Sequence, residues 1–190
     1  ASTDPDERRQ IEHLRQAEAR ILQSLWNALL LRPTLVYGAG LDHNLSRVAV
    51  WVRRCGVVPV ARPGHGLRQP VHAADLARLT VSQLDTGVSG AWAIGGGSRL
   101  SYRAMIEAVF RACGRRPRLL ELAPDTAARW WWLLGRLPGA AGLNPEMLRR
   151  QNRDLVVDDS AARERLGWAP RPFSLDGVPL RPPHRPPQER

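Results

Sequence analysis

The chain of 190 residues contains no lysine, so arginine alone supplies its 28 basic side chains. A coding bias toward arginine accounts for part of the formal net charge of +10. The arginines are spread along the sequence and form no basic stripe interleaved with aromatic residues, which is the footprint of a nucleic-acid-binding surface. The composition therefore predicts no nucleic acid partner, and small anionic ligands fit the excess positive charge better.

Cysteine is scarce, and long apolar runs are missing. Cys55 and Cys113 lie far apart without Cys-x-x-Cys spacing, which predicts reduced thiols in a cytosolic protein and no metal site. The sequence shows neither a signal peptide nor an apolar run of about 20 residues, the length that crosses a bilayer. The nearest candidate, residues 129–143, is interrupted by Arg136 and Pro138. We therefore expect a cytoplasmic protein.

Runs of strand-forming residues alternate with amphipathic segments over most of the chain, and 43% of the residues are hydrophobic. Predicted strands span residues 28–38, 57–62, 68–72, 90–97 and 116–123. Predicted helices span residues 5–22, 45–55, 76–84, 102–113, 126–137, 145–152 and 161–166. This alternation is typical of an α/β fold with a parallel sheet.

Short polar side chains precede most of these helices and are predicted to cap them. The predicted caps are Asp4, Asn44, Asp75, Ser101 and Ser160. In the first helix, Ile11, Leu14, Ala17 and Ile21 recur on one face, which predicts an apolar packing surface. Residues 1–178 are predicted to form one domain, and the proline-rich and arginine-rich residues 179–190 a disordered tail.

Five motifs follow one another in a characteristic order. They are residues 31–40, 44–52, 68–77, 95–109 and 160–173. Through these motifs the chain resembles the C-terminal half of extended or atypical short-chain dehydrogenase/reductases, the NAD-dependent epimerase/dehydratase family. The resemblance implies the C-terminal part of a Rossmann-like NAD(P)-binding fold with a small, mainly helical substrate-binding region. It also implies that the N-terminal glycine-rich half of such a domain is absent from this chain.

Two hallmarks of that family are missing. The glycines at 38–40 and 95–97 do not form a glycine-rich turn between a strand and a helix, as a dinucleotide site requires. The family's catalytic Tyr and Lys precede the strand at 28–38, and the resemblance puts Gln10 and Leu14 at their positions. Neither side chain transfers a proton at neutral pH, and the neighbouring Arg15 stays charged. The catalytic residues are therefore unassigned.

The resemblance also implies ligand contacts. The positions that match the nicotinamide site are Pro33, Thr34 and Leu35, and those that match an anionic substrate site are Asn44, Leu45 and Arg68. A guanidinium suits a diphosphate because its planar donors bind two oxygens at once. Each position also has a structural alternative: a buried strand end at 33–35, a helix cap at Asn44 and a surface arginine at Arg68. Leu35 replaces a frequent asparagine of sugar epimerases, which removes one substrate hydrogen bond.

Three further features carry weaker hypotheses. A catalytic pair of His72 and Asp75 lacks a nucleophile nearby, and Tyr37 is better interpreted as a packed aromatic residue than as a surrogate acid. Trp130–Trp132 lie in a segment that is apolar nearly all round a helix. We interpret that segment as a lid or a subunit contact, compatible with a homodimer, and a peripheral membrane contact is the alternative.

The sequence and the resemblance together predict an NAD(P)-dependent epimerase/dehydratase-like oxidoreductase. It would act on a hydroxyl or carbonyl group of a small anionic substrate, such as one that resembles a nucleotide sugar. The implied cofactor is NAD or NADP, and no metal is expected. The alternative is a non-catalytic binding or scaffold protein that keeps the fold and has lost the Tyr/Lys pair.

Overall fold

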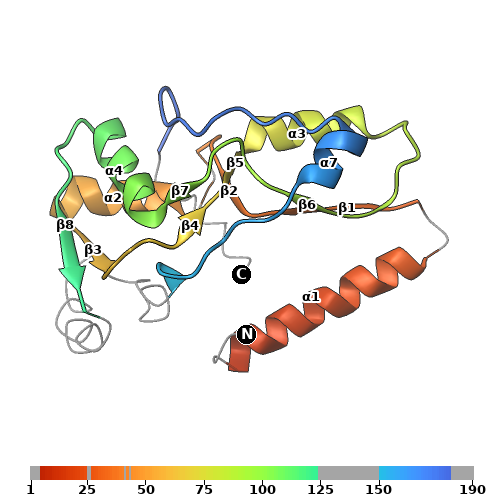
Figure 1. Ribbon diagram of the computed structural model, residues 1–190, viewed down its shortest axis with the longest axis horizontal. Helices are drawn as coiled ribbons and strands as arrows, with labels where there is room; N and C mark the ends of the chain where they lie inside the picture. The colour runs from red at the N-terminus through yellow and green to blue at the C-terminus, as the bar shows by residue number, and fades with distance from the viewer. Residues whose placement is uncertain (1–4, 25–26, 41, 43, 124–149, 181–190) are drawn as a thin grey trace, which may run out of the picture.

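The computed structural model describes residues 5–24, 27–40, 42, 44–123 and 150–180 (Figure 1). Helices and strands alternate, so the predicted α/β class is confirmed. The helices are α1 (Pro5–Gln23), α2 (Leu45–Cys55), α3 (Ala73–Ser82), α4 (Tyr102–Ala112) and α7 (Ser160–Leu166). The strands are β1 (Leu29–Pro33), β2 (Leu35–Tyr37), β3 (Val58–Ala61), β4 (Leu67–Arg68), β5 (Pro70–His72), β6 (Gly90–Ile94), β7 (Leu100–Ser101) and β8 (Leu119–Leu122). The predicted helix at 126–137, with Trp130–Trp132, and most of the one at 145–152 lie outside the described residues.

The predicted strand at 28–38 is divided at Thr34 into β1 and β2. β1 pairs in parallel with β6, from Leu29 opposite Gly90 to Pro33 opposite Ile94. β2 pairs in parallel with β5 instead. The change of partner occurs where Pro33 has no N–H to donate and where the hydroxyl of Thr34 donates to the carbonyl of Gln69. One apolar run therefore serves two different strand pairs.

Two further strand pairs and two main hydrophobic clusters complete the described fold, beside a small contact of Ala61 with Leu122. β3 pairs in parallel with β8, and β4 pairs antiparallel with β7. The larger cluster joins α2 and α4 to β2 and β3, and its largest side chains are Tyr37 and Phe110. The smaller cluster lies where α3 and α7 cover one side of the β1–β6 pair, around Ile94 and Trp168 (Figure 1). Leu180 belongs to the larger cluster, so the chain stays packed beyond the predicted start of the tail at residue 179.

α1 is present as predicted, but its apolar face is not buried against the described residues. It lies on the side of the β1–β6 pair opposite α3 and α7 (Figure 1). The side chain of Leu14 is 64% exposed, and Ile11 and Ile21 are also exposed. The expectation of a packed helix face is therefore not met within the described part of the chain.

The helix ends show which caps the sequence predicts correctly. Ser101 accepts a hydrogen bond from the amide of Ala104 at 3.1 Å and caps α4 as predicted. Gly56 ends α2 in the left-handed conformation, with φ of 69°. Asn44 precedes α2 but makes no side-chain cap. The buried Asp42 takes that role and accepts hydrogen bonds from both the amide and the hydroxyl of Ser46, at 2.9 and 2.8 Å.

Two other predicted caps are wrong by a few residues. His72, not Asp75, caps α3, since its Nδ1 accepts from the amide of Ala74 at 3.1 Å. Ser160 is the first residue of α7, and its amide donates to Asp158 at 3.0 Å. Both errors arise because a short polar residue near a helix start can bind the backbone from several positions.

Candidate functional site

The carboxyl ends of β1 and β6 meet at one edge, where α/β folds with parallel strands bind ligands. Pro33 and Thr34 end β1, and Gly95 follows β6. Gln69 joins the two ends: its carbonyl accepts from the hydroxyl of Thr34 and from the amide of Gly96, the latter at 3.2 Å. Its side-chain amide donates to the carbonyl of Gly96 at 3.2 Å. We call Pro33, Thr34, Gln69, Gly95 and Gly96 the carboxyl edge.

The glycine run 95–97 is explained by close backbone packing at this edge. A Cβ at Gly95 would overlap the side chain of Gln69, and one at Gly96 would overlap the carbonyl of Pro70. A Cβ at Gly97 would lie 2.7 Å from the carbonyl oxygen of Pro170. Glycine is needed because other parts of the chain fill the space of a side chain. This agrees with the sequence interpretation that the run is not a phosphate-binding turn.

Of the residues matched to the nicotinamide site, Pro33 and Thr34 belong to the carboxyl edge and are half-buried. Leu35 is also half-buried, and its side chain packs against the larger hydrophobic cluster. All three adjoin the edge through their backbone. The geometry of the strand ends therefore brings these three predicted residues together.

The residues matched to an anionic substrate are placed very differently from one another. Asn44 is exposed at the start of α2, after a loop in which Gly38, Ala39 and Gly40 all have positive φ. Leu45 is only 1% exposed and packs in the larger cluster. The expectation of a substrate contact at Leu45 is corrected here: its side chain is a core residue.

Arg68 has a structural role that the sequence did not indicate. It is 5% exposed. Its guanidinium donates to the carbonyls of Leu67, Arg153 and Arg150 at 2.8, 2.7 and 2.7 Å. The guanidinium also lies 5.3 Å from the ring centre of Tyr102, and burial lowers its pKa. The structural alternative of a surface arginine is therefore wrong, because Arg68 is a buried clamp between residues 67–68 and 150–153.

The segment after Arg150 is attached to the same region by its side chains. Gln151 accepts from the amide of Ala61 at 2.7 Å, and Asn152 from that of Gly64 at 2.7 Å. Asp154 accepts from the amide of Leu67 at 2.8 Å. Each side chain satisfies a backbone amide of residues 61–67. Residues 150–155 therefore form a strap over residues 61–68.

The hypothesis of a His72–Asp75 pair fails on geometry. Nδ1 of His72 is occupied by the amide of Ala74, and burial lowers the pKa of His72, as does the nearby charge of Arg171. Both oxygens of Asp75 are bound by Arg171, through the backbone amide at 3.0 Å and Nε at 2.9 Å. Tyr37 is 1% exposed, and burial raises its pKa, so it does not serve as a surrogate acid.

Tyr102 is half-buried at the start of α4, and its phenol lies beside Arg68 and Gln151. Burial raises its pKa to about 12, against smaller opposing effects of the Arg68 charge and a hydrogen bond with Gln151. A phenol with this pKa keeps its proton at neutral pH and is a weak general acid. Tyr102 therefore does not replace the missing tyrosine of the family.

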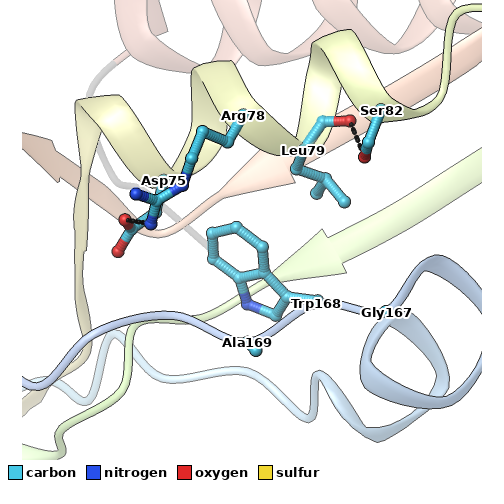
Figure 2. A pocket seen from close by; sticks show the side chains of 7 residues that line it. All are labelled: Asp75, Arg78, Leu79, Ser82, Gly167, Trp168 and Ala169. Atoms are coloured by element: carbon cyan, nitrogen blue, oxygen red, sulfur yellow. Dashed lines mark hydrogen bonds and ion pairs between the residues drawn. The ribbon is translucent and has the colours of Figure 1, made fainter.

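Asp75 holds Arg171, in the segment after α7, against α3, and Figure 2 shows its ion pair with Arg78. It is 3% exposed and forms ion pairs with Arg171 and Arg78. Burial alone raises the pKa of Asp75, but the hydrogen bonds and charge of Arg171, helped by Arg78, outweigh burial and lower the pKa. The ionised carboxylate is therefore stabilised in the folded protein.

Replacing Asp75 with alanine is expected to lower the folding stability by about 2 kcal/mol at pH 7, because the bonds to Arg171 are lost. The loss is no larger because solvent partly screens the charge of Arg171. Since the folded pKa is lowered, the stabilisation is complete above the unfolded pKa of about 4 and declines as the pH falls through the folded pKa. Urea unfolding at pH 7 and pH 3 measures the stability difference between the wild type and Asp75→Ala. Asp85→Ala, at an exposed site, is the control. A difference between wild type and variant that is undiminished at pH 3 would contradict the assignment.

A cavity of about 260 Å³ adjoins Asp75 between α3 and residues 167–169 (Figure 2). Trp168 and Leu79 supply its apolar wall, and Arg78 is the cation among its lining residues. The indole of Trp168 donates to the carbonyl of Gly95 at 2.7 Å, which fixes this wall to the carboxyl edge. Because Asp75 offsets the charge of Arg78, the cavity is not a cation-rich anion site. The sequence analysis did not identify it, since its walls come from distant segments.

No group of three His, Cys, Asp or Glu side chains in the described part of the chain is placed to hold a metal ion. Among the same residues, no helix combines the length and the apolar character needed to span a bilayer.

Comparison with known proteins was made for sequence and for structure. No family model matches the chain. The uncharacterized protein y4nG of Sinorhizobium fredii is 26% identical over 144 residues, which are 75% of this chain and 36% of that protein. This similarity carries no function, since the relative has none assigned in its name.

Solved structures of enzymes share the fold. They include dTDP-glucose 4,6-dehydratase from Bacillus anthracis in complex with NAD (TM-score 0.58, 15% identity, 93% of this chain and 50% of that one). UDP-N-acetylglucosamine 4-epimerase from Bacillus cereus is also similar (TM-score 0.55, 17% identity, 88% of this chain and 47% of that one). So is RMD from Pseudomonas aeruginosa complexed with NADPH (TM-score 0.59, 15% identity, 85% of this chain and 51% of that one). The fold is Rossmann-like. The chain spans about half the length of these three structures.

Proposed function

We propose that this Rossmann-like chain is part of an NAD(P)-dependent oxidoreductase of the epimerase/dehydratase type. It would act on a hydroxyl or carbonyl group of a small anionic substrate. The observation that carries the proposal is the carboxyl edge, where parallel strands β1 and β6 end side by side at Thr34 and Gly95. Similar solved structures were determined with NAD or NADPH bound, which supports a nicotinamide cofactor without selecting between the two.

The residues present fit one end of a dinucleotide. Pro33 and Thr34 have compact, half-buried side chains, so a flat ring can approach the backbone where β1 ends. A nicotinamide bound there would supply hydride transfer. Among the described residues, no strand is followed by a glycine-rich turn and a helix that could bind the pyrophosphate. We therefore propose that residues outside this chain hold the phosphates. On this proposal residues 1–178 form the later part of an NAD(P)-binding domain.

The substrate side follows the same edge toward α2. Asn44 is exposed at the N-terminal end of α2, where free N–H groups and the helix dipole favour an anion. Its amide makes no helix cap, so it is free to turn toward a ligand. We propose that Asn44 contacts the anionic group of the substrate. Arg68 holds the strap at residues 150–155 in place.

A second candidate function is a protein that keeps the fold without the family's catalysis. The observation in its favour is Leu14, which the resemblance puts in place of the catalytic lysine, on a helix that also lacks the tyrosine. An aliphatic side chain cannot lower the pKa of a phenol or bind a ribose. Such a protein could still bind a dinucleotide, so cofactor binding and turnover must be measured separately.

Titration of NADH into the protein expressed from its complete reading frame tests the proposal. We expect a saturable increase in NADH fluorescence, weakened at least tenfold by Thr34→Trp, which fills the space at the carboxyl edge. Leu84→Trp, on an exposed turn after α3, serves as the matched control and should bind as the wild type does. A fluorescence increase without saturation, or equal affinity in both variants, would count against a nicotinamide at this edge.

A further inference from the structure

Gln69 lies between β4 and β5 and is only 2% exposed, so its side-chain amide is buried in the protein. Oε1 of this amide accepts a hydrogen bond from the backbone amide of Val157 at 3.1 Å. Nε2 donates to the carbonyl of Gly96 at 3.2 Å. One planar group therefore joins the loop after β6 to the segment that follows the strap.

Glutamine suits this position because a primary amide both accepts and donates hydrogen bonds. An apolar side chain of similar length, such as methionine, would leave the amide of Val157 and the carbonyl of Gly96 without this partner. The side chain of Gln69 also fills its place closely, since a Cβ at Gly95 would overlap it. The identity of residue 69 therefore decides whether the two segments stay joined.

The backbone at Gln69 extends this link in both directions. Its carbonyl accepts from the hydroxyl of Thr34 and from the amide of Gly96, which both belong to the carboxyl edge. Arg68, the preceding residue, binds two carbonyls of the strap. Residues 68 and 69 thus contact the strap on one side and the carboxyl edge on the other.

The strap has few apolar contacts to hold it. None of residues 150–155 belongs to a hydrophobic cluster of the described residues, and Leu155 is 43% exposed. The strap is held by hydrogen bonds, such as those that Asn152 and Asp154 accept from backbone amides. Segments with few buried apolar contacts open at a lower free energy than the core does. We therefore expect two states of the strap, bound and released, while the sheet stays folded.

We propose that Gln69 is a positioning residue that couples the strap to the carboxyl edge. While the strap is bound, Gln69 holds the loop at Gly96 and the hydroxyl of Thr34 in place. When the strap is released, Gln69 loses its support and the edge loosens. A ligand that binds the ordered edge must then favour the bound strap by the same factor. The effect on a nicotinamide rests on the proposed function, whereas the coupling of strap and edge does not.

Amide hydrogen exchange on the protein from the complete reading frame tests the coupling without a cofactor. We call Asn152→Ala combined with Asp154→Ala the strap variant, because it weakens the strap and leaves Gln69 unchanged. Exchange at the amide of Gly96 should become about tenfold faster in the strap variant, a coupling of ordinary size. Gln69→Met should give a similar increase, and adding the strap variant to Gln69→Met should give no further increase.

Gln83→Met is the matched control, because Gln83 also joins two segments. It ends α3, and its Nε2 donates to the carbonyl of Leu166 in α7 at 3.2 Å. This control should leave the exchange at Gly96 and the affinity for NADH unchanged. The affinity for NADH should fall about tenfold in the strap variant and in Gln69→Met. Saturating NADH should slow the exchange at Leu155 in the wild type but not in Gln69→Met.

Three outcomes would overturn the inference. One is exchange at Gly96 that stays the same when the strap is weakened. Another is an additive effect of the strap variant and Gln69→Met, which would mean that the two act independently. The third is faster exchange at Gly96 in Gln83→Met, which would mean that any loss of stability loosens the edge. The expected exchange at Gly96 without saturable NADH binding would support the coupling and refute only the cofactor proposal.

Discussion

Gly96→Ala is expected to cost at least about 3 kcal/mol of folding stability, the upper end of ordinary overpacking costs. The added Cβ would overlap the carbonyl of Pro70 in β5. The backbone on both sides is fixed, because the amide of Gly96 bonds the carbonyl of Gln69 and its carbonyl accepts from the Gln69 side chain. To make room, β5 and the loop after β6 would have to separate, which would open the carboxyl edge.

The control for this variant is Gly87→Ala. Gly87 has φ of 68°, and a Cβ there would meet no atom within 4 Å. Alanine at position 87 therefore loses stability only because it must adopt the left-handed conformation, which costs about 1 kcal/mol. Urea unfolding of both variants distinguishes the stability lost through steric overlap from the stability lost through backbone strain. If Gly96→Ala were no less stable than Gly87→Ala, the close approach at the carboxyl edge would be refuted.

Arg68→Ala is expected to destabilise the fold by about 3 kcal/mol, because three carbonyl groups lose a charged donor in a buried place. The variant should release the strap at residues 150–155 first, since the carbonyls of Arg150 and Arg153 are on it. Arg68→Lys should recover little of the loss, because an ammonium group lacks the planar fork that reaches several acceptors.

Arg99→Ala provides the matched control for Arg68→Ala. Arg99 is exposed and donates to a single carbonyl, that of Val157, at 3.2 Å. Its loss should cost about 0.5 kcal/mol, the usual limit for a surface substitution. Urea midpoints and exchange rates at residues 150–155 would be measured for both variants. An Arg68→Ala protein as stable as Arg99→Ala, but with weaker affinity for a diphosphate ligand, would restore the role that the sequence suggested.

The order of helices and strands was predictable from the sequence because it depends on local periodicity. The strand at 28–38 was recognised from its apolar run, but its division at Thr34 was not. That division depends on which distant strands, β5 and β6, lie beside each half. Register and partner choice are long-range properties that periodicity does not contain.

Individual side chains in the candidate site were harder to predict for the same reason. Pro33, Thr34 and Leu35 come together because a strand end fixes all three at once. Arg68 and Leu45 were matched by sequence position, but their environment depends on residues far away. Two of the three carbonyls that bind Arg68, those of Arg150 and Arg153, are more than 80 residues distant.

We propose that a nicotinamide binds where β1 and β6 end. Hydrogen exchange of the complete protein with and without saturating NADH tests it most directly. We predict slower exchange at Thr34, Leu35 and Gly95–Gly97 when NADH is bound, with unchanged exchange in α4, which lies in the larger hydrophobic cluster. Saturable NADH binding that leaves the exchange at Thr34, Leu35 and Gly95–Gly97 unchanged would contradict the claim.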